Sequence, residues 1–129
     1  MEQRIVIEDV KTSGDVNRFQ VDVALHYKGK TARGTLEGPA TKSIDIIAQA
    51  TLNTIQQYFE NYAFHLYRVH IIKVNSHEIV VVLVNISEKG ERVALKAKQA
   101  GIALGREDLH RDIVKATLNA LNRVLGKLQ

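Results

Sequence analysis

The sequence predicts an α+β domain built from two consecutive βββα units, a tandem βββα–βββα pseudo-twofold repeat of antiparallel sheets with one helix per unit packed on them. Two observations predict this class. Residues 45–55 (DIIAQATLNTI) return one residue shorter as 112–121 (DIVKATLNAL), and each copy follows two glycines at i and i+4. Matching strand-like patterns precede both copies. We therefore expect one domain, residues 1–129, made of units at about 1–62 and 63–129.

The composition is that of a soluble globular protein. A chain of 129 residues can bury one sizeable core, and 45% of the residues are hydrophobic and 25% charged. There is no Cys, which excludes disulfides and thiolate metal sites. The chain has no signal-like segment and no apolar run near the ~20 residues of a membrane helix. We expect a cytoplasmic protein without membrane contact.

The first unit predicts three strands and a helix. The first strand contains Ile5, Ile7 and Val10. Strict alternation over 18–28 predicts a half-buried antiparallel strand, and Lys28-Gly29-Lys30 predicts a hairpin turn into a strand over 31–37. Gly38-Pro39 is expected to end the sheet, and Thr41 or Ser43 to cap a helix that fades near Asn61. Its single apolar stripe contains Ile44, Ile47, Ala48, Thr51, Leu52, Ile55, Tyr58 and Phe59.

The second unit predicts strands over 66–74, 77–86 and 92–100, and a helix over about 107–127. Residues 79–84 (IVVVLV) are apolar at consecutive positions, which is typical of a strand covered on both faces. The helices cover one face. We expect a second subunit to cover the other, which predicts a homodimer.

Two segments resemble a known family. Residues 112–125 (DIVKATLNALNRVL) and 34–40 (GTLEGPA) are similar to motifs of the C-terminal regulatory domain of 2-isopropylmalate synthase and citramalate synthase. The resemblance implies a dimer of paired βββα units that binds a branched-chain amino acid, usually leucine or isoleucine, as feedback inhibitor. Leu36 stands where the family commonly has another Gly, and the segment 104–110 is longer and more charged than the family's loop. The synthase barrel has no counterpart here, so no catalytic activity is carried over.

The glycine-containing segments are the predicted ligand site. Glycine lets a ligand approach main-chain N–H groups, and a helix N-terminus just beyond favours a carboxylate. The predicted ligand-binding residues are Gly34, Gly38, Pro39, Ala40, Gly101 and Gly105. In the alternative interpretation these glycines only turn a strand into a helix. Thr51 and Thr117 occupy equivalent helix positions, where a hydroxyl either contacts a ligand or bonds the carbonyl four residues back.

Other functional classes have weaker support. The five histidines show no paired i,i+4 helical spacing, and we expect no metal, no cofactor and no catalytic residues. The net charge of +4 is concentrated after residue 62, where eleven Lys/Arg face six Asp/Glu. An outward basic strand with Arg92, Lys96 and Lys98 therefore supports an alternative, a nucleic-acid-binding protein.

The leading hypothesis is a non-enzymatic sensing or dimerisation module, with a small amino acid and a partner enzyme as expected partners. A structural dimer without a ligand is a further alternative.

Overall fold

The computed structural model describes residues 4–75, 77–88, 97–105 and 108–123. The α+β class is confirmed: three strands precede each of two helices in the described ranges. In chain order the elements are β1 (Val6–Gly14), β2 (Arg18–Tyr27), β3 (Lys30–Pro39), a 3₁₀ turn (Ala40–Lys42), α1 (Ser43–Gln56), β4 (Tyr62–Val74), β5 (His77–Glu88), β6 (Ala97–Gly105) and α2 (Leu109–Asn122).

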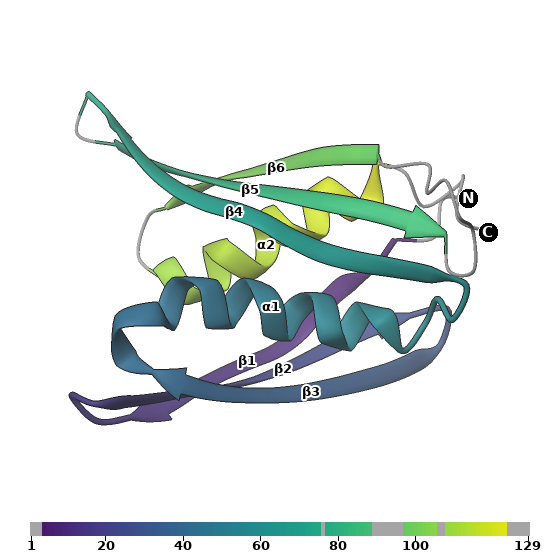
Figure 1. Cartoon of the computed structure of the whole chain (residues 1–129), viewed down its shortest axis with the longest axis horizontal. Coiled ribbons are helices and arrows are strands. Elements are labelled where there is room, and N and C mark those ends of the chain that lie inside the picture. The colour runs from purple at the N-terminus through teal and green to yellow at the C-terminus, as the bar shows by residue number, and fades with distance from the viewer. Residues whose placement is uncertain (1–3, 76, 89–96, 106–107, 124–129) are drawn as a thin grey trace.

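The two helices form the middle layer between two antiparallel sheets, ordered β1–β2–β3 and β4–β5–β6 (Figure 1). We expected each helix to pack on the sheet of its own unit. Each helix does so and also contacts the other sheet: α1 contacts β4 as well as β2 and β3, and α2 contacts β1 as well as β5 and β6. One cluster of buried side chains from both halves of the chain therefore forms the core.

Several predicted elements are confirmed, with shifted ends. The hairpin turn pairs Tyr27 with Lys30, and its two central residues, Lys28 and Gly29, have φ of 51° and 77°. Helix α1 ends earlier than expected, and neither Thr41 nor Ser43 caps it with a side chain. Strand β6 is described from Ala97, and residues 92–96 of the predicted strand lie outside the described ranges.

Helix α1 is buried on two sides, where the sequence predicted one stripe. The additional buried residues are Ile46, Ala50 and Thr54, each one turn from the next. This row crosses β3 at its two glycines: Ile46 lies over Gly38, while Ala50 and Thr54 lie over Gly34. Gly34 and Gly38 are four strand residues apart, and Ile46 and Thr54 are eight helix residues apart. Both separations are about 12–13 Å, so the row of helix side chains is as long as the distance between the two glycines.

The last residue of each helix holds the chain to a neighbouring strand through its carboxamide. Asn122 accepts from the backbone N–H of Ile5 at 3.0 Å and donates to its carbonyl at 3.1 Å. Gln56 donates to the carbonyls of Phe59 and Tyr62, at 2.8 Å and 2.5 Å. Satisfied backbone groups at these junctions fix where β1 and β4 begin.

An aromatic cluster closes one end of the core. The rings of Tyr27 and Tyr58 are 5.3 Å apart, and Tyr27, Phe59 and Phe64 continue the series at 5.6 Å and 6.1 Å. The Tyr58 hydroxyl donates to the carbonyls of Leu25 and Lys30, at 3.1 Å and 2.9 Å. Tyr58 thereby fastens the β2–β3 hairpin to the end of α1.

Replacing Gly34 tests the contact between α1 and β3. In Gly34→Ala the new Cβ meets the Thr54 hydroxyl and lies 3.4 Å from the Ala50 carbonyl oxygen, and overpacking of this kind lowers the free energy of unfolding by about 1–3 kcal/mol. In Gly34→Ala/Thr54→Ala the combined loss should be smaller than the sum of the two single losses by at least about 0.5 kcal/mol. Urea unfolding measures all three variants, and additive losses would contradict the contact. Gly38→Ala is the control, with a smaller loss, because its Cβ meets only the end of the flexible Ile46 side chain.

The Tyr58 hydroxyl predicts a pH dependence. Burial raises the pKa of Tyr58 above its ordinary value of 10.0, so above that pH the unfolded chain ionises before the folded one. The stability from this group is complete below pH 10 and is lost as the pH rises through the folded pKa. Tyr58→Phe should lower the free energy of unfolding at neutral pH by about 0.5–1.5 kcal/mol and make its alkaline decline shallower. An unchanged alkaline slope, or the same change in Tyr67→Phe, would contradict this.

Candidate functional site

Five of the six predicted ligand-binding residues lie inside strands, and Ala40 lies in the 3₁₀ turn. Gly34, Gly38 and Pro39 lie inside β3, and Gly101 and Gly105 lie inside β6, where they pair with Val82 and Glu78. Gly34 was predicted within a strand, whereas Gly38, Pro39, Gly101 and Gly105 were expected beyond the strand ends and lie within β3 and β6. At Gly34 and Gly38 the absent side chain instead makes room for α1.

The helix side of these residues is already occupied. Side chains of α1 fill the space where a Cβ of Gly34 or Gly38 would lie. The backbone N–H of Ala40 donates to the carbonyl of Asn17 at 3.0 Å, and Pro39 has no N–H. A ligand at these residues has to approach from another direction, and ligand binding by all six predicted residues stays a prediction.

The equivalent threonines serve their own helices. Thr51 donates to the carbonyl of Ile47 and Thr117 to that of Ile113, both at 2.8 Å, and both threonines are fully buried. The interpretation that each hydroxyl bonds the carbonyl four residues back is confirmed. These hydroxyls are therefore committed to the backbone.

The basic strand is only partly described. Arg92 and Lys96 lie outside the described ranges, and Lys98 lies in β6, where its backbone pairs with Asn85. Nucleic-acid contact by these residues stays a prediction.

In the described ranges no group of three or more His, Asp or Glu side chains gathers as a metal site would require. None of the helices described there is both long and apolar enough to cross a membrane.

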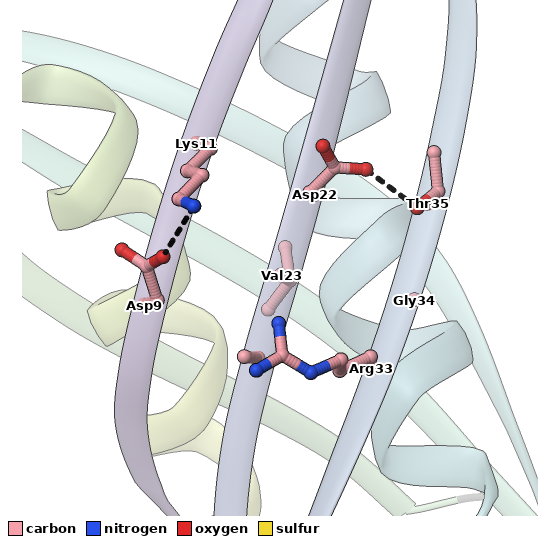
Figure 2. A pocket seen from close by; sticks show the side chains of 8 residues that line it. Asp9, Lys11, Asp22, Val23, Arg33, Gly34 and Thr35 are labelled. Atoms are coloured by element: carbon pink, nitrogen blue, oxygen red, sulfur yellow. Dashed lines mark hydrogen bonds and ion pairs between the residues drawn. The ribbon is translucent and has the colours of Figure 1, made fainter.

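The outer face of the first sheet carries a hollow whose floor is Ala24. Two rows of side chains cross this face: Asp9, Ala24 and Arg33 pair in one row, and Lys11, Asp22 and Thr35 in the next. Ala24 is only 2% exposed although it faces away from the helices, because longer neighbours surround it. The hollow, which Gly34 also lines, has a volume of about 180 Å³ (Figure 2). We call these six paired residues the Ala24 hollow.

Opposite charges line the Ala24 hollow without neutralising one another completely. Lys11 forms an ion pair with Asp9 at 3.6 Å, and the Thr35 hydroxyl donates to Asp22 at 2.5 Å. Arg33 reaches from β3 toward β2 (Figure 2), and its guanidinium forms no hydrogen bond or ion pair with any residue in the described ranges. Its backbone is held, since its carbonyl accepts from Gln57 at 2.7 Å.

The outer face of the second sheet is apolar along β5 and at the end of β4, while Arg68 and His70, which pair with Leu83 and Val81, add polar side chains to the same face. The side chains of β5 alternate: Val80, Val82 and Val84 are fully buried against the helices, and Ile79, Val81 and Leu83 are half-buried on the other face. On β4, Ile72 pairs with Ile79, and Ile72 and Val74 are 47% and 45% exposed. We call Ile72, Val74, Ile79, Val81 and Leu83 the β4–β5 apolar face. Nothing within the described chain covers it fully.

Neither a protein-family model nor a curated protein matches this chain. The two outer faces therefore have to be interpreted from their own chemistry. Sequence reasoning found the apolar face from the run at 79–84 but missed the hollow. Its signal is the alternation of Asp22 and Ala24 on β2, and this becomes a site only once the register brings Asp9 and Arg33 to either side of Ala24.

Proposed function

We propose that this chain is a non-enzymatic dimerisation and small-molecule sensing module, made of two βββα units, that associates with a second copy through the β4–β5 apolar face. The exposed part of that face is the observation that carries the proposal: Ile72 and Val74 are nearly half exposed in the described chain. Contiguous exposed apolar side chains mark interaction surfaces in soluble proteins.

Equivalent burial in the two helices supports the two-unit description. The eight buried positions of α2 follow those of α1 at a constant separation of 66 residues. In α1 they are Ile46, Ile47, Ala48, Ala50, Thr51, Leu52, Thr54 and Ile55, and in α2 they are Asp112, Ile113, Val114, Ala116, Thr117, Leu118, Ala120 and Leu121. Gln56 and Asn122, the last residues of the two helices, are separated by the same number of residues. A repeat of this kind packs naturally about a pseudo-twofold axis.

The chemistry of the face favours a second copy as the partner. The five side chains of the β4–β5 apolar face carry no charge and no hydrogen-bonding group, so they suit an equally apolar surface. A twofold dimer supplies such an apolar surface, because the same patch of each subunit contacts the other. Pairing along the β4 edge is less favourable, since the strand bulges between Leu66 and Arg68 and its edge carries exposed charge.

A sensing role is supported by the sequence resemblance to the synthase regulatory domain, which implies a branched-chain amino acid as the ligand. A ligand acts on such a module only if it binds one arrangement of the two units or subunits more tightly than another. Two subunits joined through a single face supply such alternative arrangements.

Dimerisation is tested by charging the β4–β5 apolar face at Ile72, its most exposed residue. Ile72→Glu places a carboxylate in both halves of a twofold interface, so the dimer Kd should rise at least about tenfold, the equivalent of 1.4 kcal/mol. Sedimentation velocity over a concentration series measures the Kd. Val16→Glu is the matched control, because Val16 is 90% exposed in the β1–β2 turn, away from this face. A wild-type chain that is monomeric at micromolar concentration would contradict the proposal, as would an Ile72→Glu dimer of unchanged Kd.

Sensing is tested by thermal unfolding with branched-chain amino acids. At one hundred times its Kd, a ligand specific for the folded state adds about 2.7 kcal/mol to the free energy of unfolding, which raises the Tm by several degrees. We expect this shift for at least one of leucine, isoleucine and valine at millimolar concentration. The D-enantiomers serve as controls. No shift with any of the three L-amino acids would contradict the sensing part of the proposal and leave the dimer untouched.

A further inference from the structure

We propose that the Ala24 hollow binds a small zwitterion, with its carboxylate on Arg33 and its protonated amine on Asp22. This proposal rests on the sensing part of the proposed function and assigns it a site on the first sheet, none of whose residues belongs to the β4–β5 apolar face.

The hollow exists because a small residue occupies the middle of the central strand. Ala24 pairs with Asp9 on one side and Arg33 on the other, so the backbones of Asp9 and Arg33 lie two strand spacings apart, about 10 Å. A longer residue at position 24 would fill this gap. With Ala24 there, the Arg33 side chain can extend across β2 (Figure 2), and Ala24 itself is nearly covered.

The charges around the floor are held apart. Asp22 is the diagonal neighbour of Arg33, but its carboxylate accepts from Thr35, and no ion pair joins it to the guanidinium. Arg33 therefore offers its donors to a ligand, and a guanidinium binds a carboxylate with two parallel hydrogen bonds. Asp22 retains acceptor positions beyond the one that Thr35 uses.

Only a molecule that carries both a negative and a positive charge can bind Arg33 and Asp22 at the same time. A simple anion would meet Arg33 but also the carboxylates of Asp22 and Asp9, and a simple cation would meet Lys11 and Arg33. A zwitterion places each of its charges beside the opposite one. The volume of about 180 Å³ limits it to a small molecule, for which α-amino acids are the simplest class.

The test compares a zwitterion with its two halves. We would titrate ¹⁵N-labelled protein with L-alanine, with propionate, which lacks the amine, and with ethylamine, which lacks the carboxylate. L-Alanine should shift the amides of residues 22–24 and 33–35 with a saturable, millimolar Kd, and each half should bind at least about tenfold more weakly, because each loses a charge-assisted hydrogen bond. Equal shifts with propionate, or shifts confined to other residues, would overturn the proposal.

Arg33→Gln is the decisive variant. The side chain is exposed, so the fold should be kept, and the amide spectrum checks this directly. We expect L-alanine binding to weaken at least about tenfold. Lys30→Gln is the matched control, because Lys30 lies on the same strand and loses the same charge outside the hollow. If Arg33→Gln binds L-alanine as the wild type does, the proposal fails. A leucine-induced Tm shift or a dimer that survives Arg33→Gln would leave the proposed function standing.

Discussion

The close contact between α1 and β3 is the constraint on which the arrangement of layers depends. A helix that lies between two sheets must approach both, and β3 admits this helix only because Gly34 and Gly38 present no side chain to it. The row Ile46, Ala50, Thr54 takes the vacant space, and the other side of the helix remains available to β4 and α2. Without the glycine pair, α1 would stand further from the first sheet, and the second sheet could not share the same core.

The strands and helices were largely predictable from periodicity, because alternation and helical spacing are local properties. The β2–β3 hairpin is the best example: its Lys28-Gly29 turn can be recognised in four residues of sequence, and the register follows from it. Helix α1 was predicted with a single stripe because helical spacing alone does not show that this helix contacts both sheets at once. Only tertiary packing explains why Thr54, a polar residue, is fully buried beside Ala50.

The glycines show why a local signal can be interpreted wrongly. Two glycines before a helix are typical of a turn that admits a ligand, and Gly38-Pro39 strengthened that interpretation. In β3 both glycines keep strand pairing, with Val23 and Phe19 as partners. The conformational freedom of glycine is not used at either position, since positive φ occurs at Gly14 and Gly29 instead. What matters is the absent Cβ, and this becomes visible only when α1 is in place. The hollow was missed for a related reason, since it depends on pairing between β1, β2 and β3.

The two outer faces of the sandwich have opposite chemistry, and their placement constrains how the molecule can work. The Ala24 hollow faces away from the helices on the first sheet, and the β4–β5 apolar face does so on the second, so the helix layer separates them (Figure 1). A second copy bound to the apolar face therefore leaves both hollows of the dimer open at its two outer surfaces. Occupation of the hollow can influence dimerisation only through a difference in the way α1 and α2 pack between the sheets. The threonine hydroxyls of these helices are buried and bond their own backbone, and the part-buried carboxamides of Gln56 and Asn122 bond neighbouring backbone groups, which leaves little freedom for such a difference. In the proposed dimer we therefore expect the two hollows to bind independently.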